Sequence, residues 1–187
     1  MTKHRSWTFD ELIEAEGKGE RLDFELFWGH TPPKSGELGP HVFSQWWPHE
    51  FQADGVSYPT AEHFMMAEKA RLFDDDDALA EILAAVRPAE AKAGGRKVRG
   101  FDNSVWEQHR MDIVIRASVA KFDSDDSMRA YLLGTGSRVL VEASPVDSIW
   151  GIGMAQDNPS AEKPSEWKGL NLLGFALMEA RAVLANS

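Results

Sequence analysis

Apolar residues recur along this chain with two different spacings, and the spacing predicts the type of each element. A return every three to four residues predicts a helix, and alternation predicts a strand. The predicted helices are residues 8–16, 77–85, 88–94, 104–122, 127–133 and 170–185, together with a helix that Thr60 caps and that runs to about Phe73. The predicted strands are residues 23–28 and 138–142, and residues 51–58 form two short β-like runs around Asp54-Gly55, a hairpin signal.

These elements add up to an α+β fold that is mostly helical and has a small antiparallel sheet. With 187 residues, the chain has the usual length of one domain, and we find no internal repeat and no low-complexity linker in it. We therefore expect a single domain over residues 1–187, in which residues 1–22 are an N-terminal extension with a short helix.

Charge and composition narrow the class of function. The chain has 20 Lys and Arg against 30 Asp and Glu, so its net charge is −10. This acidity argues against extended binding along a nucleic-acid backbone, which needs clustered basic residues. Cysteine is absent, which removes disulfides, thiolate nucleophiles and cysteine-based zinc sites. No run approaches the ~18 apolar residues of a membrane span, and no signal-peptide core follows Met1, so we expect a cytoplasmic protein without a membrane partner.

Several catalytic and cofactor motifs are incomplete or missing. The run His49-Glu50-Phe51-Gln52-Ala53 has Ala53 where a zinc-binding His-Glu-x-x-His motif needs its second histidine. A P-loop, a Rossmann phosphate fingerprint and a Gly-x-Ser-x-Gly elbow do not occur. The four aspartates 74–77 are predicted to be a solvated loop or the start of a helix, rather than a metal cluster. The sequence therefore requires no metal and no organic cofactor.

An acid and an amine share one face of the helix that follows Thr60. Glu62 and Lys69 are seven residues apart, so at about 100° per residue they differ by only ~20° around the helix axis. Met66 lies between them on that face. The alternative interpretation is that Glu62 only favours the helix macrodipole and that Lys69 only extends its amine to solvent.

A second group of residues follows the strand at 138–142. After Glu142 a turn presents Asp147, and Trp150 precedes Gly151. Glycine lets backbone N–H groups approach a ligand closely, so such a loop is typical of a small-molecule site. The alternative is a tight turn with a core tryptophan. Further on, Asn171 begins an apolar helix as either a backbone cap or a ligand contact.

The charge inverts locally between residues 87 and 121, where eight basic and four acidic residues give +4. The densest part, residues 94–100, contains Arg96 and Lys97. A phosphate group would suit these side chains because arginine offers a bidentate fork. The alternative is ordinary surface charge.

Together these segments resemble the YbiA-like, or NADAR, family. The matching runs are residues 27–30, 43–48, 58–70, 95–98, 121–122, 133–136, 142–153 and 167–174. They fall in the order of the family and cover nearly the whole chain from about Phe24 onward. One departure is Phe43-Ser44-Gln45-Trp46, where many members have Leu-Ser-Asn-Phe. This departure affects the expected substrate pocket at Gln45 and Trp46.

The resemblance implies an α+β, mostly helical domain and an N-glycosidase that breaks the C1′–N bond of a ribosyl phosphate. Members of the family act on early phosphorylated intermediates of riboflavin synthesis or remove ADP-ribose from guanine. The acid and the lysine of the family map to Glu62 and Lys69. The Asp and Trp of its Asp-x-x-Trp-Gly run map to Asp147 and Trp150.

Residue chemistry offers two routes for this bond. Cleavage builds positive charge at C1′, which one carboxylate stabilises while a second acid protonates the leaving nitrogen or activates water. Glu62 and Asp147 are this pair, with their roles left open. In the other route, a Lys69 amine of lowered pKa forms a Schiff base at C1′ of the ring-opened sugar. Burial beside Met66 would lower the Lys69 pKa, whereas a close Glu62 would raise it.

The expected partner is a small ribosyl phosphate or an ADP-ribosylated guanine. Trp150, Trp106 and Trp46 are expected to stack on the base or flank the ribose, and Arg96 and Lys97 to contact phosphate. Two other classes compete with the enzyme: a module that binds ADP-ribose or a related nucleotide without cleaving it, and a structural or partner-binding protein.

Overall fold

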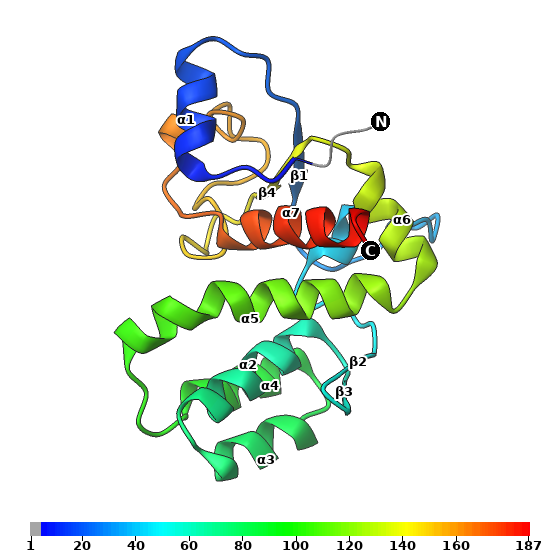
Figure 1. Ribbon diagram of the computed structural model, residues 1–187, viewed down its shortest axis with the longest axis vertical. Coiled ribbons are helices and arrows are strands. Elements are labelled where there is room, and N and C mark those ends of the chain that lie inside the picture. Colours follow the sequence, from blue (N-terminus) through cyan, green and yellow to red (C-terminus); the bar gives the residue numbers. More distant parts are fainter. Residues whose placement is uncertain (1–4) are drawn as a thin grey trace. The chain divides into compact units, whose positions relative to one another are not determined.

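The computed structural model describes residues 5–187, whose elements are traced in Figure 1. Its α-helices are α1 (Phe9–Gly17), α2 (Ala61–Leu72), α3 (Asp76–Ala84), α4 (Pro88–Arg96), α5 (Asn103–Asp123), α6 (Asp126–Gly134) and α7 (Leu172–Ala185). Its strands are β1 (Phe24–Phe27), β2 (Phe51–Ala53), β3 (Val56–Tyr58) and β4 (Val139–Glu142), and two short 3₁₀ helices are η1 (Pro40–Phe43) and η2 (Pro164–Glu166).

The predicted α+β, mostly helical fold is confirmed. Each predicted helix and strand begins and ends within two residues of the observed one. The prediction of one antiparallel sheet was incomplete, because the structure has two two-stranded sheets. The β2–β3 hairpin is antiparallel, whereas β1 pairs with β4 in parallel.

The chain divides into two compact units, residues 1–44 with 125–187, and residues 45–124. We call them the strand unit and the helical unit. The single domain that the length predicts stays a prediction.

The strand unit is built on the parallel pair, in which Phe24 lies opposite Val139 and Phe27 opposite Glu142. Strand β4 is buried over its first three residues, and α7 packs against it while α6 packs against α7. Figure 1 shows α7 beside β4. Because the strands are parallel, the ends of β1 and β4 meet at one edge, from which the loop after Glu142 starts.

A close approach of helix to strand in this unit depends on Gly174. A Cβ added to Gly174 would lie 2.1 Å from the Leu140 carbonyl oxygen and 2.5 Å from the Asn171 amide nitrogen. Neither the strand backbone nor the buried Asn171 side chain has room to move away. The glycine therefore sets the distance between α7 and β4.

Gly174→Ala should destabilise the protein by about 1–3 kcal/mol because the added methyl overpacks this contact. The matched control is Gly134→Ala, also in a helix, where an added Cβ meets nothing within 4 Å. Alanine favours a helix over glycine by roughly 0.5–1 kcal/mol, so the control should be neutral or stabilising. Urea denaturation measures both, and equal stabilities of the two variants would contradict the packing argument.

The helical unit has α2 at its centre, packed against α3, α4 and α5. This helix is buried at every position from Ala61 to Ala67. The β2–β3 hairpin turns through Asp54 and Gly55, both with positive φ (52° and 77°), as a tight two-residue turn requires. Gly95 lets α4 approach α2, because a Cβ there would overlap the Met66 sulfur.

Candidate active site residues

Glu62 lies in the first turn of α2 and is 3% exposed. The helix starts where the Thr60 side chain accepts a hydrogen bond from the His63 N–H, as its predicted capping role requires. The Glu62 N–H donates to the Gln45 carbonyl at 3.0 Å. Burying a carboxylate is costly, so the helix macrodipole, which acts equally on an exposed acid, does not account for this position.

Lys69 is half-buried two turns further along α2. Its Nζ donates to the Gly95 carbonyl at 2.8 Å and lies 4.1 Å from the ring centroid of Phe101 and 5.7 Å from that of Trp106. Burial lowers the pKa of the Lys69 amine. Among residues 5–187, no carboxylate forms an ion pair with this amine, so its position is held by a carbonyl and two rings.

Three of the other expected contacts, Gln45, Trp46 and Trp106, lie in the helical unit, and two of them contact Glu62 or Lys69. Gln45 is buried and holds the Glu62 N–H through its carbonyl. Trp106, in the first turn of α5, is mostly buried and faces Lys69. Trp46 is partly exposed, and its ring centroid lies 5.7 Å from Lys92 Nζ on α4.

The basic segment is largely neutralised by carboxylates that the sequence does not place beside it. Lys97 pairs with Glu81 of α3 at 2.6 Å, so it is already occupied as a phosphate contact. Arg99 binds Asp75 and Asp77. Arg96 is exposed and makes no ion pair in the described part of the chain. Of the two predicted phosphate contacts, Arg96 is therefore the one available to a ligand.

The aspartate run begins a helix, as one of its two interpretations predicted. Asp75 caps α3 by accepting from the Ala78 N–H. It also accepts from the Arg99 guanidinium and N–H, which hold the pKa of this carboxyl well below its usual range. Within residues 5–187, no three acidic or histidine side chains are grouped so as to hold a metal ion.

In the strand unit, the loop after β4 fixes Asp147 in a tight turn. Its Oδ1 accepts from the N–H groups of Ile149 and Trp150, both at 2.8 Å. Its Oδ2 has no hydrogen-bond partner among the described residues. Trp150 is partly exposed, so it is not the core tryptophan of the alternative interpretation.

Gly151 and Asn171 have packing and hydrogen-bonding roles around this loop that the sequence did not indicate. A Cβ on Gly151 would lie 2.7 Å from the Glu142 carbonyl oxygen, so the glycine is needed for packing. Asn171 is fully buried in a left-handed conformation, and its side chain bonds the Glu142 N–H and the Leu140 carbonyl of β4. Asn171 is the N-cap residue of α7, but its side chain makes no cap hydrogen bond and instead positions β4. Its predicted contact with a ligand stays a prediction.

Two residues in the helical unit were missed as candidates from the sequence. Phe101 contacts Lys69. The sequence feature that could have marked it is its position directly after Gly100, in the loop before α5. Lys121 is a lysine only 1% exposed, on α5. The run Lys121-Phe122 contributed to the family resemblance, but it did not indicate that the Lys121 side chain is buried.

Lys121 makes the stability of the protein depend on pH. Burial lowers the pKa of this amine to about 7 from 10.5. Between these values the unfolded chain binds a proton that the folded chain does not, so the free energy of unfolding rises with pH from about 7 to 10. Lys121→Met should flatten this rise, with its largest stabilisation near pH 6. Urea denaturation at pH 6, 8 and 10 measures it, and parallel pH dependences of variant and native protein would contradict it.

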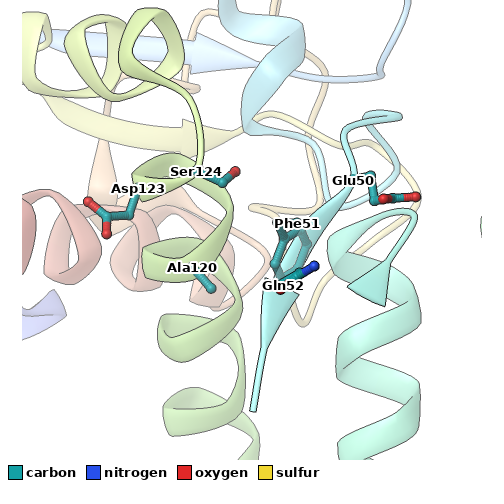
Figure 2. Close-up of a pocket in the computed structure, with 6 residues that line it drawn as sticks. All are labelled: Glu50, Phe51, Gln52, Ala120, Asp123 and Ser124. Atoms are coloured by element: carbon teal, nitrogen blue, oxygen red, sulfur yellow. The ribbon is translucent and has the colours of Figure 1, made fainter. Parts of the chain in front are cut away.

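A pocket in the helical unit is lined by none of these candidates. It has a volume of about 570 Å³ and is lined by Glu50, Phe51, Gln52, Ala120, Asp123 and Ser124 (Figure 2). Figure 2 shows these side chains coming from β2 and its preceding residue and from the end of α5. Two carboxylates in the lining repel an anion, so this pocket does not suit a phosphate.

Comparison with known proteins gives the family. Residues 26–185 match the NADAR domain. The chain belongs to the NADAR family. The resemblance seen in its motifs is thereby confirmed. Within residues 5–187, no helix combines the length and the apolar character that crossing a membrane requires.

Relatives of this NADAR protein carry names that bear on its chemistry. N-glycosidase R617 of Acanthamoeba polyphaga mimivirus is 38% identical over 78% of this chain and 88% of its own length. N-glycosidase YbiA of Escherichia coli is 34% identical over 74% of this chain and 77% of its own. The maize chloroplastic riboflavin biosynthesis protein PYRR is 36% identical over 75% of this chain and 23% of its own. The NMR structure of E. coli YbiA superposes with a TM-score of 0.67 at 29% identity, covering 89% of this chain and 88% of YbiA.

Proposed function

We propose that this NADAR protein is an N-glycosidase that hydrolyses the C1′–N bond of a ribosyl phosphate. The observation that carries the proposal is the buried carboxylate of Glu62 on the same helix as the desolvated amine of Lys69. A protein that only binds a nucleotide needs neither. The names of R617 and YbiA support the reaction, and that of PYRR supports a riboflavin-pathway substrate.

In the first route, two carboxylates divide the work. A carboxylate removed from water interacts more strongly with charge that develops at C1′, which suits Glu62. Asp147 has Oδ1 fixed by two backbone N–H groups and Oδ2 free in the described structure, which suits a group that transfers a proton.

In the second route, Lys69 acts as a nucleophile. The C1′–O4′ bond first opens, with O4′ taking a proton, and the neutral amine then attacks C1′ of the ring-opened sugar. The bond from C1′ to the base nitrogen breaks, and that nitrogen takes a proton from the attacking amine as it leaves. The remaining Schiff base between C1′ and Nζ is hydrolysed by water, which releases the ribosyl phosphate and restores the amine. The lowered pKa of Lys69 makes the neutral amine accessible nearer to neutral pH.

Incubation with two substrate types tests the proposal: a phosphorylated riboflavin-pathway intermediate and an ADP-ribosylated guanine. Chromatography follows the release of ribose 5-phosphate or ADP-ribose. We expect release from one of them, and the preferred one identifies the substrate class. Tight binding of both without release over many hours would overturn the enzyme in favour of the binding module.

Borohydride added during turnover separates the two routes. A Schiff base on Lys69 would be reduced to a stable adduct, found by intact mass and peptide mapping. No adduct, together with full activity of Lys69→Ala, would leave only the carboxylate route.

A further inference from the structure

We propose that Phe101 is a positioning residue that holds the Lys69 amine by its ring. This inference deepens the proposed function, since it concerns the amine of the same site. The ammonium lies 4.1 Å from the Phe101 ring centroid, well within the ~6 Å over which a cation is attracted to an aromatic face. Trp106 adds a second, more distant ring, and the Gly95 carbonyl accepts the hydrogen bond.

Two neighbouring residues, Gly100 and Phe73, hold the Phe101 ring in place. Gly100 turns the chain with a φ of 69° directly before Phe101. The Phe101 ring then packs edge-on against Phe73, at 5.3 Å between centroids and 61° between planes. Phe73 is the C-cap of α2, one turn after Lys69, so the helix that carries the amine also supports the ring that covers it.

The third contact of the amine, the Gly95 carbonyl, has its own support. Gly95 lies against Met66 so closely that a side chain there would overlap the Met66 sulfur. Met66 lies one turn before Lys69 on α2. The carbonyl that accepts from Lys69 is therefore fixed by the packing of α4 on α2.

No charged group of the described residues touches the Lys69 amine, although several lie on α2 and on the elements packed against it. On α2 itself, Glu68 binds Arg71 and Arg116, and Glu62 lies two turns earlier. Several charged or titratable groups lie on the packed elements α3, α4 and α5 and on the loop that carries Phe101. They are Glu81 with Lys97, Asp75 and Asp77 with Arg99, Asp76, Arg87 with Glu90, Lys92, Arg96, Asp102, which caps α5, Glu107 with Arg110, His109, Asp112 with Arg116, Lys121 and Asp123. The partners that touch the Lys69 amine are all uncharged.

An aromatic ring and a carboxylate affect the protonation of the Lys69 amine differently. A carboxylate at this distance would stabilise the ammonium strongly and keep its proton at neutral pH. A ring attracts the ammonium more weakly and leaves the desolvation of the amine in force. Phe101 thus fixes where the amine lies while still allowing it to lose its proton.

Two substitutions of Phe101 test this role, because they are expected to shift the Lys69 pKa in opposite directions. Phe101→Glu puts a carboxylate beside the amine and should raise the Lys69 pKa by about one unit. Phe101→Leu keeps apolar cover but removes the ring, and should lower it. The control is Phe9→Glu in the strand unit, because Phe9 and Phe101 are both 43% exposed. Exposure of this degree makes all three variants compatible with folding.

The measurement is the pH profile of reductive methylation of Lys69, read by peptide mass spectrometry on the full chain without substrate. We expect the half-labelling pH to move up in Phe101→Glu, down in Phe101→Leu and not at all in Phe9→Glu. Equal profiles in all four proteins would overturn the role of Phe101, whatever the activity. Shifted profiles in a protein that cleaves neither substrate type would instead overturn the proposed function and leave Phe101 as the residue that positions Lys69.

Discussion

Replacing Glu62 with glutamine is expected to lower kcat for N-glycosidic hydrolysis by about 100-fold or more, the usual range for loss of an acid or base group. Glutamine keeps the size of the side chain and its place in the first turn of α2. It carries neither the charge that stabilises C1′ nor a proton to transfer. The melting temperature should change little, so the loss can be assigned to chemistry.

Glu68→Gln is the matched control for this substitution. Glu68 lies on the same helix but is occupied by Arg71 and Arg116, both at 2.7 Å. Its replacement should cost some stability through two lost ion pairs and leave kcat within about twofold. A Glu62→Gln protein with the kcat of the native chain would remove Glu62 from the mechanism.

Replacing Asp147 with asparagine is expected to reduce kcat by a similar factor of about 100 while leaving the fold intact. The amide oxygen of asparagine can still accept from the Ile149 and Trp150 N–H groups, so the turn is retained. The negative charge and the second carboxylate oxygen are lost. Steady-state kinetics on the substrate that the native chain cleaves measures the effect.

Asp147→Ala separates the two roles of this side chain. It removes the turn as well as the charge, so it should lower both the melting temperature and kcat. If Asp147→Asn kept full activity and Asp147→Ala lost it, the side chain would act only by shaping the loop.

The helices were predictable because their signals are local. Thr8, Thr60, Asp75, Asp102 and Asp125 each accept backbone N–H bonds at a helix start, and apolar spacing set the lengths. The pairing of β1 with β4 was not predictable, since more than a hundred residues separate them and only tertiary packing joins them.

The sequence predicted most of the residues that belong to the candidate site, but it predicted the role of each residue only in part. Helical spacing placed Glu62 and Lys69 on one face of α2, and the structure keeps them on that helix. The roles of Lys97 and Asn171 depended on partners far away in the sequence, Glu81 and the backbone of β4. A single sequence carries no record of such partners, so Lys97 was predicted to contact phosphate, and Asn171 to be either a backbone cap or a ligand contact.

The direction of the Lys69 pKa shift could not be predicted from the sequence either. The sequence offered an apolar neighbour and an acid with opposite effects on the Lys69 pKa. The structure gives the amine a carbonyl and two rings instead, and burial lowers its pKa. Burial dominates because, among the described residues, no carboxylate pairs with the amine, and the sequence does not show which partners the fold brings to it.

The most direct measurement of the central claim is a time course of both products from a ribosyl phosphate substrate. Free base or amine and free ribosyl phosphate are quantified together for the native chain, Glu62→Gln and Asp147→Asn. We predict equal amounts of the two products from the native chain over many turnovers, and about 100-fold slower formation by each variant. Bound but uncleaved substrate with the native chain, or equal rates in all three proteins, would contradict it.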